Sequence, residues 1–275
     1  MSKEILNIAG YRFTELPDRD ELRESFLEFC TNSTLKGTVL LSPNGINFSL
    51  AGLRDRVSDF IDFLESDVRF TGIPIKSSYT NYQPFKRMLV KRKNEIISLG
   101  LREIKPSRFT GPHIKPGEFK QLLDQRRDIL VLDTRNDYEV RIGSFEGALD
   151  LGISSFRQFP AAIKSLPDEY KSKQVVMYCT GGIRCEKASA VMLNEGFSDV
   201  KQLEGGVLGY FEECGGSHWN GDCFVFDQRV ALDHKLSETN IEMCFNCREP
   251  LSVDEQKSEN YAVGEYCPYC YAGHA

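Results

Sequence analysis

The segment Val175-Val-Met-Tyr-Cys-Thr-Gly-Gly-Ile-Arg-Cys-Glu-Lys-Ala188 decides the fold of the chain that contains it. Its first four residues form an apolar run, which is typical of a strand buried on both faces of a parallel sheet. A cysteine, a short glycine-containing loop and a helix-forming stretch follow directly. This order predicts an α/β domain, in which ligands bind at the carboxyl ends of the strands.

The residues of this loop predict an activated cysteine. Backbone N–H groups of a tight loop can converge on an anion, and the start of the following helix adds partial positive charge. Arg184 supplies a full positive charge. Because each effect favours a thiolate, we expect Cys179 to be a nucleophile whose sulfur faces a cavity or solvent. The alternative is a buried structural cysteine. The predicted active-site loop comprises Cys179, Thr180, Gly181, Gly182, Ile183 and Arg184.

The loop resembles the active-site loop of the rhodanese family, whose cysteine carries a persulfide. Residues 131–139, Val-Leu-Asp-Thr-Arg-Asn-Asp-Tyr-Glu, resemble a strand and turn of that family. The resemblance implies that Asp133 and Arg135 lie near the loop. Leu203-Glu-Gly-Gly206 matches a late family motif, whereas Ile142-Gly-Ser-Phe-Glu-Gly-Ala148 lacks the histidine usual at its position.

Two other interpretations of the loop concern its size and its second cysteine. A phosphatase of related fold would place five residues between its cysteine and arginine, whereas four separate Cys179 from Arg184. The smaller loop suits a sulfur atom better than a phosphate. Cys185 is either a resolving thiol that forms a disulfide with Cys179, or a packed residue of the first helical turn.

The remaining segments predict three parts, at residues 1–105, 114–213 and 214–275. In the central part, strands are expected at 129–133, 175–178 and 200–203, and helices at 118–124 and 185–194. In the first part, strands are expected at 11–14, 38–41, 46–50, 73–77 and 87–98, with helices beginning at Asp20 and Leu53. The βαββαβ order of the first part predicts a ferredoxin-like or acylphosphatase-like α+β sandwich. One further strand is expected at 223–230.

Charge is unevenly distributed along the chain. The net charge is −6, but residues 81–120 contain ten basic and three acidic residues, a local charge of +7. This segment either contacts an anionic partner or forms a solvated strand and linker. Aromatic residues within it could stack on unpaired bases or belong to the core. The candidate RNA-contacting residues are Lys86, Arg87, Lys91, Arg92 and Lys93, with Tyr82, Phe85 and Phe109 as the aromatics.

The C-terminal part is rich in cysteine. The chain has nine cysteines, and an odd number argues against a disulfide framework. Two Cys-x2-Cys pairs separated by 19 residues fit the spacing of a structural zinc site with four thiolate ligands. The predicted ligands are Cys244, Cys247, Cys267 and Cys270. Cys214 and Cys223 are a second possible thiol pair, without an assigned role.

Several classes of protein are excluded or disfavoured. No apolar run approaches the ~18 residues that span a bilayer, and the N-terminus lacks a signal-peptide core, so we expect a cytoplasmic protein. The acidic balance of the whole chain argues against indiscriminate DNA or RNA binding. No Gly-rich nucleotide fingerprint and no iron-binding triad is recognisable.

Further segments extend the resemblance to most of the chain. Residues 37–52, 156–160 and 223–230 are similar to the oxygen-dependent tRNA uridine hydroxylases, a family with a rhodanese domain. The resemblance implies 5-hydroxylation of the wobble uridine in the tRNA anticodon loop, molecular oxygen as co-substrate and an essential Cys179. The alternatives are a rhodanese-type sulfurtransferase with a cysteine persulfide and a nonenzymatic RNA- or protein-binding adaptor.

Overall fold

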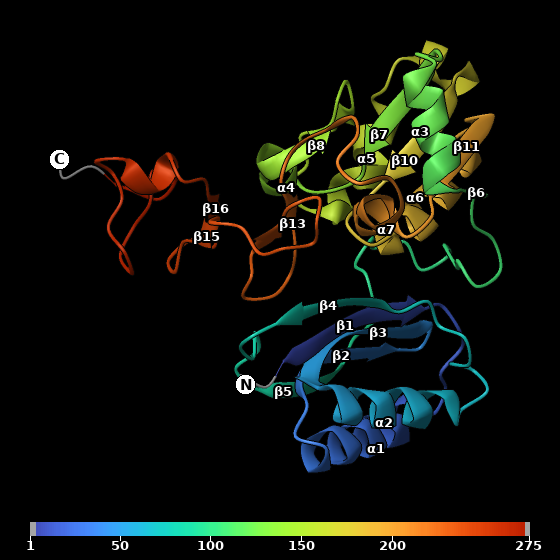
Figure 1. The fold of residues 1–275 in the computed structure, drawn as a ribbon. Helices are drawn as coiled ribbons and strands as arrows, with labels where there is room; N and C mark the ends of the chain where they lie inside the picture. Colours follow the sequence, from blue (N-terminus) through green and yellow to red (C-terminus); the bar gives the residue numbers. More distant parts are fainter. Residues whose placement is uncertain (1–3, 273–275) are drawn as a thin grey trace. The chain divides into compact units, whose positions relative to one another are not determined.

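A mixed five-stranded sheet organises the first of two units in the computed structural model, which describes residues 4–272 (Figure 1). The units comprise residues 1–110 and 111–275. Strand order is β4-β1-β3-β2-β5, with β5 parallel to β2 and the other neighbours antiparallel. The predicted ferredoxin- or acylphosphatase-like sandwich is confirmed, with β5 as an added edge strand. The strands are β1 (Ile5–Arg12), β2 (Lys36–Ser42), β3 (Gly45–Leu53), β4 (Lys76–Thr80) and β5 (Met88–Arg92).

Two helices, α1 (Arg19–Asn32) and α2 (Arg54–Glu65), cover one face of this sheet (Figure 1). Phenylalanines hold them together, and the ring of Phe26 meets that of Phe60 edge to face at 6.1 Å. Asp20 was expected to cap α1, but the cap position is Asp18, whose carboxylate accepts a 2.7 Å hydrogen bond from Arg69.

All five strands of this unit differ from their predicted bounds, and β1, β4 and β5 differ most. β1 pairs with β3 from Ile5 to Arg12, although Asn7 and Gly10 conceal its strand pattern in the sequence. β4 begins three residues later than expected. β5 ends at Arg92 rather than residue 98, because the Glu95 carboxylate accepts backbone N–H groups of the turn that follows.

The second unit contains a five-stranded sheet of order β6-β11-β10-β7-β9, in which all neighbours are parallel. The strands predicted at 129–133, 175–178 and 200–203 are its three central members. Four residues of β10 are fully buried, as the continuous apolar run requires. The strands are β6 (His113–Ile114), β7 (Ile129–Asp133), β9 (Leu149–Asp150), β10 (Gln174–Tyr178) and β11 (Asp199–Leu203).

Helices complete the α/β domain. Within it, α3 packs against α7, and α5 packs against α6. Phe145 joins the layers, and its ring lies edge to face on those of Tyr178 and Tyr210 at 4.9 and 4.8 Å. The helices are α3 (Pro116–Asp124), α4 (Asp137–Ile142), α5 (Phe159–Lys164), α6 (Ile183–Asn194) and α7 (Gly206–Cys214), with 3-10 turns η1 (Phe156–Gln158) and η2 (Asp168–Ser172).

The C-terminal segment has only short ladders. The strand expected at 223–230 is wrong beyond Phe224, because Val225 N–H donates to the Val230 carbonyl at 2.8 Å and closes a tight turn. The paired strands are β8 (Gly143–Phe145) with β12 (Trp219–Gly221), β13 (Cys223–Phe224) with β14 (Ala231–Leu232), and β15 (Glu242–Met243) with β16 (Pro250–Leu251); η3 (Glu255–Lys257) follows. Across residues 4–272, the helices are too short or too polar to cross a bilayer.

Candidate active site

The predicted loop connects the central strand β10 to α6. Cys179 follows the last residue of β10, and the loop ends where α6 begins at Ile183. Gly182 occupies the N-cap position of α6 with φ +97°, a left-handed conformation that a glycine adopts without steric cost. The loop therefore stands at the carboxyl end of a parallel sheet, where α/β domains bind their ligands.

The sulfur of Cys179 is surrounded by groups that stabilise an anion. The backbone N–H of Gly182 donates to it at 3.1 Å. Burial alone would raise the pKa of Cys179, but a hydrogen bond from Cys185, the charge of Arg184 and backbone N–H groups outweigh it and lower the pKa to about 6. The thiolate is therefore the main form at neutral pH.

Access to this sulfur differs from the prediction. Cys179 has no exposed surface, so the expectation that it faces solvent or a cavity is wrong for this conformation. Residues 223–224 contact the loop at Thr180, whose hydroxyl lies 3.3 Å from the Glu139 carboxylate and 3.4 Å from the Phe224 carbonyl, two acceptors that share its single proton. The loop itself reaches the surface at Gly181, beside which an added methyl group would meet open space. The sulfur thus lies directly beneath a polar, partly exposed loop.

A glycine outside the loop holds it in place. The N–H groups of Val207 and Leu208, at the start of α7, donate to the carbonyls of Cys179 and Thr180 at 3.0 and 3.1 Å. Gly206 has φ +61°, and a Cβ there would lie 2.3 Å from the Cys179 carbonyl oxygen. The Leu-x-Gly-Gly motif therefore allows the α7 backbone to approach the Cys179 loop.

Arg184 is paired with a residue that the sequence analysis did not select. Both oxygens of the Glu139 carboxylate accept hydrogen bonds from the Arg184 guanidinium, at 2.6 and 2.7 Å. Glu139 is fully buried and also accepts the Asn136 backbone N–H at 3.2 Å. The Asn-x-x-Glu spacing is a capping-box signal that could have identified this residue.

Asp133, the last residue of β7, and Arg135 just beyond it are completely buried. Their side chains pair with each other at 2.6 Å, and Arg135 also donates to the Gly143 carbonyl at 2.6 Å. The guanidinium contacts two adjacent aromatic rings, with its carbon 5.1 Å from the Trp219 ring centroid and 5.5 Å from that of Tyr178. Arg135 thereby links Asp133, the last residue of β7, to Gly143 and to the ring of Tyr178, the last residue of β10.

Cys185 lies in the first turn of α6 and faces the interior. Its sulfur is 3.6 Å from the Thr134 hydroxyl, and burial raises its pKa well above the usual value. Burial likewise raises the pKa of Cys223 to about 12. Cys179 is therefore the thiol of this group that ionises at neutral pH.

Comparison with known proteins identifies the family. Residues 5–96 match the family described as UPF0176 acylphosphatase like domain, and residues 115–213 match the Rhodanese-like domain. A Cupriavidus necator protein named tRNA uridine(34) hydroxylase is 47% identical over 272 residues, which cover 97% of this chain and 96% of that protein. A relative of the same name from Acaryochloris marina is 43% identical, with 98% and 87% covered. The chain belongs to the tRNA uridine(34) hydroxylase family.

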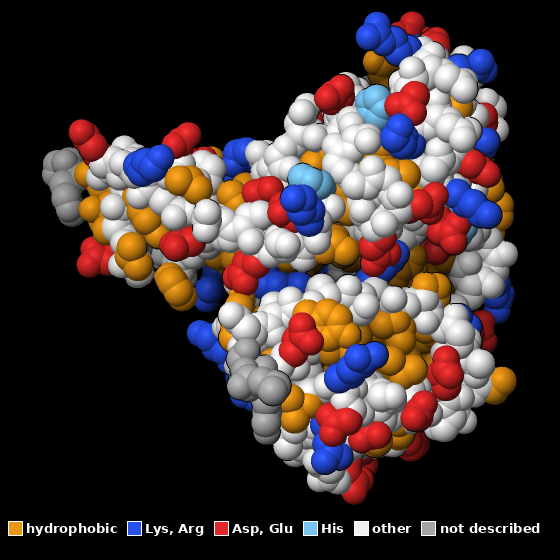
Figure 2. Space-filling model, viewed as in Figure 1, with side chains coloured by type: hydrophobic (Ala, Val, Ile, Leu, Met, Phe, Trp, Pro, Cys, Tyr) orange, Lys and Arg blue, Asp and Glu red, His pale blue; other side chains and the backbone are white. Residues whose placement is uncertain are grey.

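The five candidate RNA-contacting residues lie on the edge strand β5 and directly before and after it, and all are exposed. They do not form one face, since neighbouring strand residues point to opposite sides. Arg92 turns toward α1 and pairs with Asp20 at 2.9 Å. On the face drawn in Figure 2, Lys and Arg side chains are scattered among Asp and Glu.

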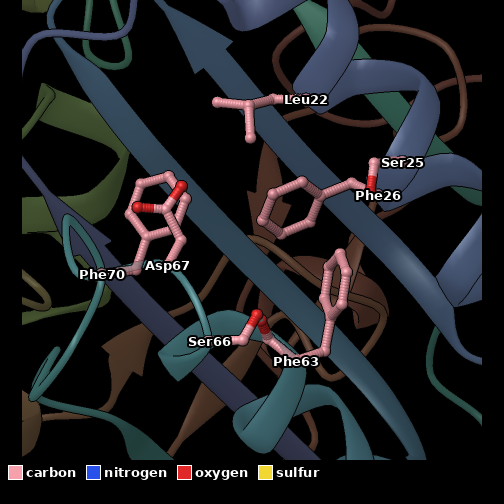
Figure 3. A pocket seen from close by; sticks show the side chains of 7 residues that line it. All are labelled: Leu22, Ser25, Phe26, Phe63, Ser66, Asp67 and Phe70. Carbon is pink, nitrogen blue, oxygen red and sulfur yellow. The ribbon is translucent and has the colours of Figure 1, made fainter.

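The first unit contains a small pocket of about 160 Å³ between α1 and the end of α2 (Figure 3). Phenylalanine rings and Leu22 make up most of its lining, with Ser25, Ser66 and Asp67 as the polar members. Asp67 is already paired with Arg69 at 2.6 Å. The pocket therefore offers no free charged group to a ligand.

The four predicted metal ligands, Cys244, Cys247, Cys267 and Cys270, lie close together in the structure. Their sulfur atoms lie within 4.8 Å of one another. The sulfur of Cys267 lies 3.5 Å from that of Cys247 and 3.8 Å from that of Cys270, and the sulfurs of Cys244 and Cys270 are 3.8 Å apart. A tetrahedron of ~2.3 Å zinc–sulfur bonds has edges of about 3.8 Å, so this arrangement fits such a metal. The cluster can therefore bind a metal ion.

Proposed function

We propose that this chain hydroxylates the wobble uridine of tRNA at C5 and that Cys179 is its reactive residue. The observation that carries the proposal is the relationship to proteins named tRNA uridine(34) hydroxylase over nearly the whole chain. The lowered pKa of Cys179 adds a nucleophile at the expected edge of the sheet.

The loop residues have separate roles in this proposal. The Gly182 N–H and the Arg184 charge keep the sulfur anionic, and Glu139 keeps Arg184 in place. Asp133 and Arg135 fix the neighbouring strand end. Hydroxylation replaces the C5–H bond of uridine with C5–OH, a two-electron oxidation of the base. Molecular oxygen is the proposed source of the new oxygen atom, and its second atom would leave as water after reduction by two electrons from an external reductant.

The burial of Cys179 adds a conformational step. Since the sulfur has no exposed surface and the adjacent Thr180 contacts the Phe224 carbonyl, the proposed step is a shift of residues 223–230 that lets a base reach it. The Thr180 bond to the Phe224 carbonyl is long, at 3.4 Å, and its loss costs little.

We assign a separate role to each of the three predicted parts of the chain, residues 1–105, 114–213 and 214–275. The first part contacts the anticodon stem and loop, the second holds the reacting sulfur, and the third is a metal-stabilised tail. The exposed basic residues around β5 are the proposed phosphate contacts. These residues are Lys86, Arg87, Lys91, Arg92 and Lys93.

Zinc is the metal we propose for the tail. Four thiolates at tetrahedral spacing are the ligand set of structural zinc. Such a site has no open coordination position, so its role is to fold residues 242–272 rather than to take part in the reaction.

The test is nucleoside mass spectrometry of tRNA from cells that lack other uridine-hydroxylating enzymes. Expression of this chain should produce 5-hydroxyuridine, and growth under ¹⁸O₂ should place the heavy isotope in the new hydroxyl group. Unmodified tRNA would contradict the function. Product without the isotope would contradict the oxygen source alone.

A rhodanese-type sulfurtransferase is the second candidate, because the Cys179 loop lies within the matched rhodanese domain. Purified protein would be incubated with thiosulfate and cyanide. Thiocyanate that disappears in the Cys179→Ser variant would favour this activity, and its absence from the wild type would exclude it.

A further inference from the structure

A tight turn is fastened to the catalytic loop. Residues 223–230, named here the cover turn, begin with β13, whose Phe224 carbonyl accepts the Thr180 hydroxyl. The backbone closes at Val225 and again where Val230 N–H donates to the Asp227 carbonyl at 3.2 Å. The cover turn is therefore a compact element rather than a loose loop.

The cover turn is rigid. Asp227 and Arg229 form an ion pair at 2.6 Å, with side chains only 5% and 8% exposed. Val230 has φ +61°, a left-handed conformation that β-branched residues rarely adopt. Backbone strain of this kind persists where the surroundings impose it, and it is concentrated at functional sites.

Phe226 is the residue that this rigid turn holds in solvent. Its side chain is 64% exposed, although it lies next to the catalytic loop. Its ring contacts Phe224 edge to face at 5.1 Å, and the Arg184 guanidinium carbon lies 5.8 Å from its centroid. Phe224 is itself anchored on Tyr138 at 5.3 Å. The ring of Phe226 is thus mostly exposed to solvent, and it contacts Arg184 of the Cys179 loop.

We propose that Phe226 is the stacking platform for the target base, a docking site for an unpaired pyrimidine beside the catalytic loop. Proteins recognise unpaired RNA bases by stacking them on aromatic rings and arginine planes. Arg184 next to the ring adds a cation to the same position. This inference rests on the proposed function, since it assigns the contact that holds the uridine of the anticodon loop.

The cover turn then has two linked tasks. It contacts the Cys179 loop at Thr180 and Arg184, and it carries the ring that receives the base. A base stacked on Phe226 would pull on the same turn whose Phe224 carbonyl covers Thr180. Base docking and opening of the loop would therefore occur through one element.

The first test measures RNA binding without turnover, on the full chain with oxygen removed. The probes are two anticodon stem–loops, one with uridine at position 34 and one with dihydrouridine, whose saturated ring is not aromatic. The wild type should prefer uridine by about 5- to 100-fold, the range expected for one stacked base. Phe226→Ala should remove the preference. The matched control Phe245→Ala, an equally exposed phenylalanine of the tail, should retain it.

The second test does not depend on a truncated side chain. Phe226→Trp preserves stacking and adds an exposed indole, since the chain's single tryptophan, Trp219, is buried. The uridine stem–loop should quench the new fluorescence, and the dihydrouridine stem–loop should quench it much less. A uridine preference that persists in Phe226→Ala, a wild type without any preference, or an indole that uridine leaves unquenched would each overturn the proposal.

These outcomes are separate from the proposed reaction. Stacking is measured as binding, whereas hydroxylation is measured as product in tRNA. A protein that prefers the uridine stem–loop through Phe226 but forms no 5-hydroxyuridine would contradict the proposed reaction. The same result would support the proposed docking site.

Discussion

At the scale of single residues, the decisive feature is the competition between burial and charge at Cys179. Complete burial disfavours a thiolate, yet a neighbouring thiol, a guanidinium and backbone N–H groups reverse the balance. The same site keeps Cys185 protonated, because its raised pKa follows from burial beside an anionic neighbour. The surroundings of the two thiols thus make Cys179 a thiolate and keep Cys185 neutral.

This balance predicts the pH dependence of the reaction. With a Cys179 pKa of about 6, the thiolate fraction is small below that pH and nearly complete by pH 8. Single-turnover rates should therefore rise as pH increases through about 6 and then level off. A rate that still rises tenfold per unit between pH 7 and 9 would contradict a thiolate of this pKa.

The buried pair of Glu139 and Arg184 predicts a large loss of stability. Glu139→Gln leaves a buried guanidinium without its counter-ion, which costs about 3–5 kcal/mol. The control is Glu249→Gln, since the Arg141–Glu249 pair is about one-third exposed and contributes no more than about 1 kcal/mol. Urea unfolding followed by Trp219 fluorescence reports on this unit. Equal losses in the two variants would show that burial does not distinguish these pairs.

At the scale of elements, α7 determines the shape of the catalytic loop. Gly206→Ala should be poorly tolerated, because its Cβ would overlap the Cys179 carbonyl and its φ is positive. Gly181→Ala should leave the melting temperature nearly unchanged, since the added methyl group meets open space. Thermal unfolding of both variants checks this difference. A similar melting temperature for both would show that α7 can move away from the loop.

The sequence predicted those parts of the site whose residues are consecutive in the chain, and it did not predict contacts between distant residues. The β10–loop–α6 segment could be predicted because its strand, thiol, glycines and arginine lie within 14 consecutive residues. Glu139 and Phe224 could not be selected in this way, because each reaches Thr180 from more than 40 positions away. The expectation that Cys179 is exposed failed for the same reason, since the cover turn is distant in sequence.

Strand limits show a second kind of error. The apolar pattern located β2, β3, β7 and β10 well, because each has alternating or continuous burial. β1 was largely missed, since Asn7 is buried in a strand by hydrogen bonds to β4, a compensation that no local pattern reveals. Residues 225–230 resemble a strand in composition but form a turn fixed by an ion pair.

At the scale of the whole molecule, an acylphosphatase-like unit, a rhodanese domain and a cysteine-rich tail occur in one chain. The tail is tied to the rhodanese domain through Arg141 of α4, which pairs with Glu249 at 2.8 Å. Because Glu139 lies on the same helix, the tail contacts the element that supports Arg184.

Metal removal tests the proposed role of the tail. Metal analysis should find about one zinc per chain. Chelation should raise amide hydrogen exchange in residues 242–272 and leave β10 protected, since the tail has little apolar core besides its cysteines. A metal-free protein with unchanged protection in the tail would contradict a structural zinc site.

The central claim is that the Cys179 thiolate carries out hydroxylation of tRNA. The most direct measurement is in vitro: purified wild type and Cys179→Ser are incubated with unmodified tRNA and oxygen, and the nucleosides are analysed by mass spectrometry. The account predicts 5-hydroxyuridine at position 34 with the wild type and none with the variant, whose circular dichroism and melting temperature stay close to those of the wild type. Equal product from a folded Cys179→Ser protein would contradict it.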